Sequence, residues 1–354
     1  MQKLSRRAIK VDYLRISHLY FLALKKQPNR LASLHLLLLK NWLSRAEDIL
    51  PAFLMSKKQP ICLVAVENNE LIASINIKPI NKRGTSWSFS LPKCFSEPKW
   101  NTPREIKLRL IKASLELEPK SIQNWLIKCP SSYIEELSIL RELGFQPQKM
   151  IRSWSINLDN KDRVLSYSKA ELPNSFRWEK INKDNARLLW KIELAGESVN
   201  YREIIDRQST DLIEKANKFS GVLISKEGTD LNVIAGLIPQ DFPEDQTTLK
   251  LIRDLVWDSR LTYAIPEILK TICINQNEII IETNSKDDYV NNILKSIGLE
   301  PNIENIILGK SNLRRKNKTA FSSNFKTIEG MLGELNPGNS PLPSPSITPP
   351  IKIG

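Results

Sequence analysis

The residue types that most often hold metals or act as nucleophiles are scarce and widely separated in this sequence. It contains two histidines and four cysteines, at His18, His35, Cys62, Cys94, Cys129 and Cys273. No two cysteines have the Cys-x-x-Cys spacing of zinc or redox motifs. We therefore expect no metal site and no disulfide framework, and a cytoplasmic setting in which thiols stay reduced.

Charged side chains are the other source of chemistry, and they are unevenly distributed. The 354 residues include 52 Lys and Arg against 39 Asp and Glu, a formal net charge of +13. Residues 1–160 hold 26 of the basic and 13 of the acidic residues, so the first half carries the whole excess. A basic half favours anionic partners, such as phosphate-bearing cofactors, nucleic acid or acidic proteins. The alternative is that the excess positive charge of residues 1–160 only reflects a Lys-rich, soluble surface with no anionic partner.

The elements that must position these groups occur twice. Trp125-Leu-Ile-Lys-Cys129, a helix-like stretch and Leu143-Gly-Phe145 recur 154 positions later as Ile279-Ile-Ile-Glu-Thr283, a helix-like stretch and Ile297-Gly-Leu299. A repeat of this length indicates two similar domains, because solenoid repeats are far shorter. We predict a basic first domain at 1–158, a linker at 159–175, a second domain at 176–310 and a disordered basic and Pro-rich tail at 311–354.

The first copy reads as alternating apolar runs and capped helices. Thr102-Pro103-Arg104-Glu105 is a capping box with proline at the first helical position, and Gly144 suits a left-handed helix end. Turn residues between three strands indicate antiparallel pairing. The predicted order is strand 6–11, a helix capped by Asp12, helix 30–54, strands 61–66, 71–77 and 86–91, helix 103–117, strand 124–128, helix 132–143 and strand 151–157.

The second copy repeats this order of elements. The predicted elements are strand 176–181, a helix starting at Asp184, helix 201–217, strands 222–225, 232–238 and 248–257, helix 264–274, strand 278–283, helix 286–297 and strand 302–308. In the whole chain, the most apolar stretch is Leu36–Leu39. It is too short to span a bilayer, which needs about 20 apolar residues, and we do not expect membrane attachment.

This order of elements, seen twice, resembles the GNAT superfamily of N-acyltransferases over about residues 6–157 and 176–309. Leu143-Gly-Phe145 looks like the family's final Leu-Gly-Phe turn, and Asp254-Leu-Val256 leading to Arg260 looks like its fourth strand entering the cofactor loop. The resemblance implies an α/β (α+β) fold of two GNAT-like domains. Each would have a mixed, largely antiparallel sheet flanked by helices.

The resemblance also implies an acyl-coenzyme A, such as acetyl-CoA, held in a cleft between the fourth and fifth strands. A glycine-rich loop before the next helix would present backbone N–H groups to the pyrophosphate. Both copies lack these glycines. The loop positions implied for cofactor binding in the second copy are Arg260, Leu261 and Thr262. In the first copy, side-chain phosphate contacts could come from Lys99, Arg104 and Lys107, unless these form a solvated basic helix face.

The catalytic groups that the resemblance implies are altered as well. The family's tyrosine before the Gly-Phe turn, a general acid toward the leaving thiolate, is Leu140 in one copy and Leu294 in the other. Tyr263 is an alternative acid, unless it is a core or rim aromatic. A base that deprotonates an amine could be Asp254, with Glu282 and Asp258 as other carboxylates in the region.

Two function classes remain open from the sequence. One is a divergent acyl-CoA-dependent N-acyltransferase that modifies an unidentified amine acceptor. In one form of this hypothesis, one copy is active and the other is inactive. The other is a non-catalytic GNAT-fold binding protein whose basic first domain engages nucleic acid or an acidic protein. Saturable acyl-CoA binding separates the two classes.

Overall fold

The computed structural model of the chain describes residues 9–15, 60–67, 70–117, 122–226, 232–243, 247–274 and 278–312. These residues belong to one compact unit that ends at Asn312. The helices predicted after Asp12 and at 30–54, and the tail from 313 onward, lie outside the described residues. Within the described part, no helix is long and apolar enough to cross a membrane.

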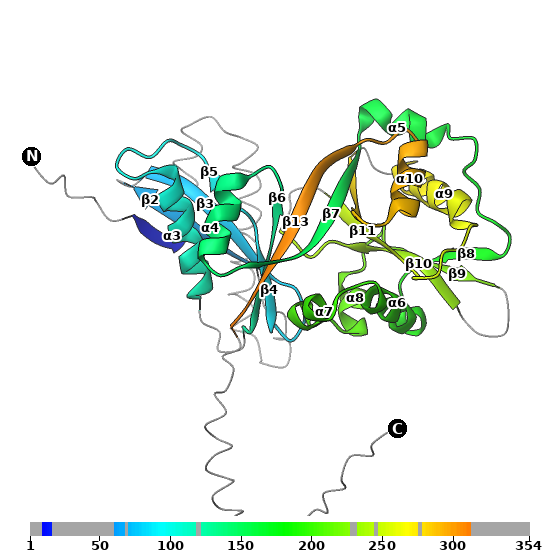
Figure 1. The fold of residues 1–354 in the computed structure, drawn as a ribbon, viewed down its shortest axis with the longest axis horizontal. Helices are drawn as coiled ribbons and strands as arrows, with labels where there is room; N and C mark the ends of the chain where they lie inside the picture. The colour runs from blue at the N-terminus through cyan, green and yellow to red at the C-terminus, as the bar shows by residue number, and fades with distance from the viewer. Residues whose placement is uncertain are drawn as a thin grey trace, which may run out of the picture. The chain divides into compact units, whose positions relative to one another are not determined.

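A single mixed sheet is the framework of the described residues (Figure 1). Its strand order is β1-β2-β3-β4-β6-β13-β7-β12-β11-β10-β9-β8, with β5 beside β3. All neighbours are antiparallel except β4 with β6 and β11 with β12, which are parallel. The strands are β1 (Lys10–Tyr13), β2 (Ile61–Glu67), β3 (Glu70–Pro79), β4 (Ser86–Phe89), β5 (Lys93–Cys94), β6 (Asn124–Pro130), β7 (Gln146–Ile156), β8 (Phe176–Glu179), β9 (Gly221–Ser225), β10 (Asn232–Pro239), β11 (Thr248–Arg253), β12 (Ile279–Asn284) and β13 (Pro301–Ser311).

Helices flank this sheet, which confirms the predicted fold class. In the second half, α6, α7 and α8 lie on one face, and α5, α9 and α10 lie on the other (Figure 1). The helices among the described residues are α3 (Pro103–Leu115), α4 (Ile134–Glu142), α5 (Leu158–Leu165), α6 (Lys183–Ala195), α7 (Val199–Ile205), α8 (Ser209–Lys215), α9 (Leu261–Ile274) and α10 (Asp288–Ser296).

The final strand of each copy lies in the other copy's half of the sheet. β7 ends the first copy but pairs with β12 of the second, where Ile151 lies opposite Asn284. β13 ends the second copy but pairs with β6 of the first, where Ile307 lies opposite Lys128. β7 and β13 also pair with each other. The two copies therefore exchange their last strands, and the sheet continues from one copy into the other without an edge.

The strand order is a palindrome, and its centre is a pseudo-twofold axis. The axis passes between β13 and β7, where Ile151 lies opposite Asn305, its own counterpart 154 residues later. Lys128 and Glu282 are also counterparts at this offset, and Lys128 Nζ lies 2.7 Å from Glu282 Oε1. Residues that the repeat makes equivalent therefore meet at the axis, as they do in a symmetric dimer.

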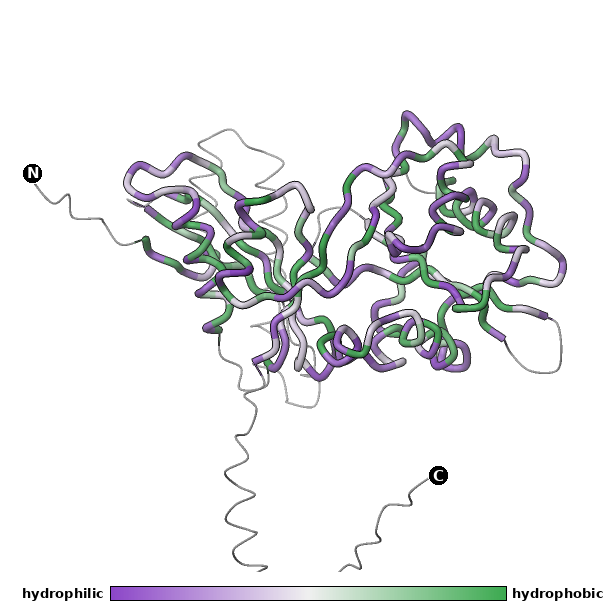
Figure 2. The backbone as a smooth tube through the Cα atoms, viewed as in Figure 1, coloured by the Kyte–Doolittle hydropathy of each residue, from purple (hydrophilic) through white to green (hydrophobic). Residues whose placement is uncertain are grey.

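Local sequence signals explain why the elements begin and end where they do. Thr102 Oγ1 accepts from the Glu105 N–H at 3.2 Å while Glu105 Oε2 accepts from the Thr102 N–H at 2.9 Å, so the predicted capping box is present. Gly144 and Gly298 end α4 and α10 with φ of 85° and 89°, which β-carbon-bearing residues rarely adopt. The inner strands are buried on both faces: β4 and β9 are buried at every position, and Figure 2 shows apolar stretches along the strands.

Several elements differ from the prediction: Asp12 lies inside β1 rather than at a helix start, and β7 begins at Gln146 rather than at 151. The predicted helix 201–217 is two helices, because Asp206 takes a left-handed φ of 46° and α8 starts again at Ser209. The predicted linker contains α5, which Asn157 caps through a reciprocal contact with Asn160. β11 ends at Arg253 rather than Trp257: the Asp254 N–H still donates to the Ile234 carbonyl of β10 at 2.8 Å, and the chain turns away after it.

Polar contacts join the turn between β3 and β4 of the first copy to α7 and α8 of the second. Asn81 Nδ2 donates to the Asp206 carbonyl at 2.9 Å, and Thr85 Oγ1 donates to Asp206 Oδ2 at 2.5 Å. Lys82 N–H donates to Asp211 Oδ1 at 2.8 Å. Beneath these contacts lies an apolar cluster drawn from both copies, which comprises Ile80, Leu126, Ile151, Tyr201, Ile205, Phe242 and Ile307. The predicted domain boundaries remain a prediction, since both copies share one sheet and this cluster.

Candidate functional site

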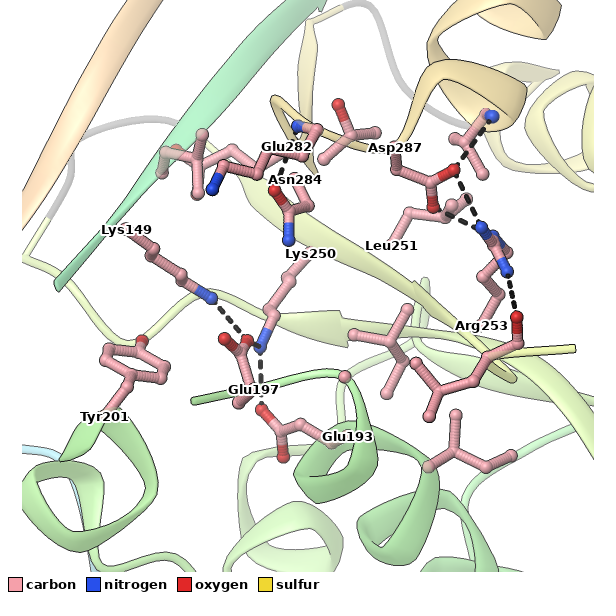
Figure 3. Close-up of a pocket in the computed structure, with 18 of the residues that line it drawn as sticks. Lys149, Glu193, Glu197, Tyr201, Lys250, Leu251, Arg253, Glu282, Asn284 and Asp287 are labelled. Atoms are coloured by element: carbon pink, nitrogen blue, oxygen red, sulfur yellow. Dashed lines mark hydrogen bonds and ion pairs between the residues drawn. The ribbon is translucent and has the colours of Figure 1, made fainter. Parts of the chain in front are cut away.

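A pocket of about 200 Å³ opens where the parallel strands β11 and β12 separate (Figure 3). The two strands pair only from Thr248 with Ile280 to Lys250 with Glu282. Beyond this point β11 continues to Arg253 beside β10, and β12 continues to Asn284 beside β7, but the two strands no longer pair with each other. The pocket extends from this opening to the face covered by α6 and α7, and both exchanged strands contribute lining residues.

The deep end of the pocket is a chain of alternating charges. Lys250 Nζ lies 2.8 Å from Glu197 Oε1 and 3.0 Å from Glu193 Oε1. Lys149, from the exchanged strand β7, forms an ion pair with the same Glu197 oxygen and lies 4.3 Å from the centre of the Tyr201 ring. Figure 3 shows these five side chains converging from β7, β11, α6 and the start of α7. First-copy and second-copy residues thus share one charged centre.

The ion pairs continue below the pocket into the core. Arg207 Nη1 lies 2.6 Å from Glu193 Oε1, and its other terminal nitrogen contacts Asp241. Lys215 Nζ lies 2.6 Å from Asp241 Oδ1 and also contacts the Ile80 carbonyl of the first copy. Buried charges are stable only when paired and hydrogen-bonded in this way. The chain of ion pairs holds α6 and α8 to the sheet and fixes the floor of the pocket.

Burial and neighbouring charges shift the protonation of these groups. Burial would raise the pKa of Glu193, but the charges of Arg207 and Lys250 outweigh it and lower the pKa to about 2. The pKa of Glu197 is lowered in the same way, because Lys250 and Lys149 offset its burial. Burial, together with the charge of Lys250, lowers the pKa of Lys149 to about 8. Both carboxylates are therefore ionised at neutral pH, while Lys149 is close to its titration midpoint.

The outer end of the pocket is bridged by a second set of contacts. Arg253 at the end of β11 binds both carboxylate oxygens of Asp287, at 2.8 and 3.0 Å. Asp287 also caps α10 by accepting from the Val290 N–H. Next to this pair, the Trp257 and Tyr289 rings are stacked with centroids 4.7 Å apart. These contacts tie the end of β11 to the start of α10 across the opening.

Glu282 lines the pocket but is almost fully buried. It pairs with Lys128 at 2.7 Å, and Gln240 donates to its other carboxylate oxygen. Ser153 lies 3.4 Å from it on the neighbouring strand. Its location on the pseudo-twofold axis makes Glu282 a structural contact between the copies.

The second-copy residues predicted from the sequence do not all lie in the pocket. Asp254 lines the pocket, and its Oδ1 accepts from the Val256 N–H at 3.1 Å. Arg260 lies in the following loop, paired with Asp258 at 2.7 Å, and its guanidinium packs on the Phe176 ring. Leu261 is the first residue of α9 and is fully buried in the core. Thr262 and Tyr263 occupy the first turn of α9, and the Tyr263 side chain is 46% exposed. Of the predicted second-copy residues, Asp254 and Glu282 line the pocket, and Arg260, Leu261, Thr262 and Tyr263 do not.

The first-copy residues predicted for phosphate contacts lie at the start of α3, away from this pocket. Arg104 pairs with Glu142 at 2.7 Å, and Lys107 pairs with Glu135 and Glu136, both at 2.7 Å. Lys99 has an exposed side chain, and its backbone N–H donates to Glu67 at 2.7 Å. The carboxylates of α4 thus partly neutralise this basic face. An anionic macromolecular partner for the first copy remains a prediction.

Sequence reasoning missed Lys149, Glu193, Glu197 and Lys250. Glu193 lies in α6 and Glu197 lies just after its C-terminal end. The two are four residues apart, a spacing that puts them on the same side of a helix and can be seen in the sequence. Lys149 could not be assigned, because its place in the second-copy pocket depends on the strand exchange. A pocket built from one copy alone would leave it out.

Known structures show the same fold at low sequence identity. A Drosophila protein is 14% identical over 86% of this chain and 99% of its own, with a TM-score of 0.53. A GCN5-related glucosamine N-acetyltransferase region of a fungal multi-domain β-N-acetylglucosaminidase is 10% identical over 87% of this chain and 38% of its own, with a TM-score of 0.50. A tandem GNAT protein from the clavulanic acid biosynthesis pathway is 9% identical over 86% of this chain and 98% of its own, with a TM-score of 0.48.

No protein-family model matches the sequence, and no curated protein matches it. At these identities, the two matches with TM-scores of 0.50 and 0.53 show the fold and not the activity. The repeated order of elements, the parallel pairing of the fourth and fifth strands in each copy and the likeness to the GCN5-related region all agree. The chain has a tandem GNAT-like fold.

Proposed function

We propose that the chain is an acyl-CoA-dependent N-acyltransferase and that the pocket of the second copy is its active site. The observation that supports this most directly is the separation of β11 and β12 after Lys250 and Glu282, with a pocket at the point of separation. An extended thioester arm can enter between two such strands and reach the buried charges beneath. The same point in the sheet is where the sequence resemblance implies the acyl-CoA cleft.

The residues around the opening fit an acyl-CoA by side chains rather than by a glycine loop. The loop amides of Val256 and Arg260 already donate to Asp254 and Asp258 within the loop. Arg253 and Lys286 line the pocket, and Arg260 lies in the loop after β11; these cationic side chains would hold the phosphates in place of backbone N–H groups. When bound, the cofactor supplies an activated acyl group whose carbonyl carbon an amine can attack.

The chain's own residues would bind and orient the acceptor and exclude water. Ile192, Leu251 and Ile307 give the pocket an apolar wall, and the deep Glu193 and Glu197 carboxylates stay ionised. A water-poor site with fixed charges strengthens each polar contact to a substrate. Positioning an amine beside a thioester supplies much of the rate enhancement in such a reaction.

Isothermal titration of acetyl-CoA into the full chain tests this proposal. We expect saturable, micromolar binding by the unmodified protein and at least tenfold weaker binding after Asn284→Trp, because Asn284 is exposed at the pocket opening and an indole there would fill it. Lys169→Trp, at an exposed linker position outside the pocket lining, is the matched control and should bind like the unmodified chain. Absence of binding at millimolar acetyl-CoA would overturn the proposal.

A further inference from the structure

The pocket contains one residue from the other copy that is placed to do chemistry. Lys149 comes from β7, the strand that the first copy contributes to the second copy's half of the sheet. We propose that Glu197 and Lys149 form the acceptor-amine site: Glu197 binds the ammonium group of the acceptor, and Lys149 takes its proton. This inference rests on the proposed acyltransferase function and deepens it.

Glu197 has a carboxylate oxygen available to a ligand. Lys149 and Lys250 both bind Oε1. Among the described residues, no group donates to Oε2 of Glu197. Unlike Glu193 Oε2, which is buried without a partner, Glu197 Oε2 is not fully buried. It is therefore accessible, and Glu197 lines the pocket. In Figure 3 the two dashed contacts of Glu197 join it to Lys149 and Lys250. Its other carboxylate oxygen faces the space between Lys149 and Tyr201. An ionised carboxylate with one open oxygen is a suitable partner for an ammonium ion.

The surroundings of Lys149 weaken its hold on a proton on balance, because its burial and Lys250 outweigh the nearby carboxylates. The charged and titratable groups that act on it are Glu193 and Glu197 from α6 and its end, Tyr201 from α7 and Lys250 from β11. Its burial and the charge of Lys250 outweigh both glutamates and bring its pKa to about 8. An amine with a pKa close to the working pH can accept a proton and release it again, as a general base requires. A second ammonium ion in the pocket would lower the pKa further.

The size and lining of the pocket define the class of acceptor. About 200 Å³ holds a small molecule or one side-chain-sized group and not a folded protein surface. The wall between the charges is aliphatic, from Ile151, Ile192, Leu251 and Ile307. A short aliphatic primary amine satisfies both features, with its ammonium at Glu197 and its carbon chain against the isoleucines.

The proton and bond changes balance without another reactant. The acceptor ammonium gives one proton to the neutral Lys149 amine and becomes a free amine. The amine nitrogen then forms a C–N bond to the thioester carbonyl carbon, and the C–S bond breaks. The nitrogen loses its second proton to the departing thiolate, and the proton on Lys149 is released to solvent. The products are the amide, coenzyme A and one proton.

Lysine-specific ¹³Cε NMR on the full chain tests the site without any need for turnover. The Lys149 signal is assigned by its loss in Lys149→Arg. We expect it to titrate near pH 8, well below the other lysines, and to shift saturably when ethylammonium chloride is added. Sodium chloride at equal ionic strength should leave it unchanged, and Glu197→Gln should abolish the response to ethylammonium. A titration midpoint near 10, or no response to ethylammonium, would overturn the inference.

A kinetic measurement separates this inference from the proposed function. Coenzyme A release from acetyl-CoA and ethylamine should fall at least tenfold in Lys149→Arg, which keeps the charge but cannot act as a base, while acetyl-CoA affinity stays unchanged. If acetyl-CoA binds and Lys149→Arg releases coenzyme A at the normal rate with the normal pH profile, the base assignment is wrong and the function stands. If acetyl-CoA does not bind while Lys149 responds to ethylammonium, the amine site stands and the acyltransferase function fails.

Discussion

At the scale of single residues, the second copy depends on buried charges that satisfy one another. Glu193 contacts both Arg207 and Lys250 while its side chain is only 4% exposed. In such a network, a lost partner leaves an opposite charge buried without compensation, which is far more destabilising than the loss of a surface ion pair. The pocket therefore has a polar lining that cannot be altered one charge at a time without loss of stability.

Replacement of Lys250 by methionine tests this dependence. Lys250→Met removes the cation that both Glu193 and Glu197 contact, and we expect the free energy of unfolding to fall by about 3 kcal/mol. Arg104→Met is the control, since its ion pair with Glu142 is largely exposed and should contribute less than about 1 kcal/mol. Urea unfolding midpoints compare the two. Equal, small losses would contradict the view that the Lys250 pairs are essential.

At the scale of elements, helix ends were the features best predicted from sequence. The capping box at Thr102 and Glu105 can be predicted from the local sequence alone, because its two hydrogen bonds join residues only three positions apart. The break after Ile205 gave no such signal. Asp206 adopts a left-handed conformation there without a glycine, and its side chain is held by Arg83 and Thr85 of the first copy. Long-range contacts decided that break, so the predicted helix 201–217 was wrong.

The cap of α3 gives a prediction at this scale. Thr102→Ala removes the side-chain acceptor for the Glu105 N–H, and we expect a loss of about 1 kcal/mol in stability. Thr102→Ser keeps the hydroxyl and should retain most of the stability. Thermal unfolding of the three proteins, followed by circular dichroism, makes the comparison. A Thr102→Ala protein as stable as the parent would show that the cap is not required.

At the scale of the whole molecule, the exchanged strands make the two copies interdependent. β7 and β13 pair with each other and each joins the fifth strand of the opposite copy. The repeat in the sequence predicted two GNAT-like copies and the order of elements in each. It did not predict the exchange, because the apolar pattern of a final strand is the same whichever neighbouring sheet receives it. Lys149 was missed for this reason, whereas Asp254, on the second copy's own strand end, was placed at the pocket.

Cleavage of the linker tests the exchange. A specific protease site inserted between Ser168 and Lys169, both in an exposed part of the linker, would cut the chain between the copies. We expect the two fragments to co-elute in gel filtration under native conditions and to separate only in urea, because their strands remain interleaved. An uncut sample of the same variant is the control. Separation of the fragments in native buffer would contradict the exchanged arrangement.

The Lys128–Glu282 pair on the pseudo-twofold axis has a consequence for the history of the chain. In a dimer of identical subunits both positions would hold the same residue, and two lysines or two glutamates would repel each other. With both copies in one chain the two positions can differ, so an ion pair can replace a like-charged contact. The same freedom applies to the rest of each half. Once fused, one half can keep a working site while the other gives up its own and serves as the partner that completes it.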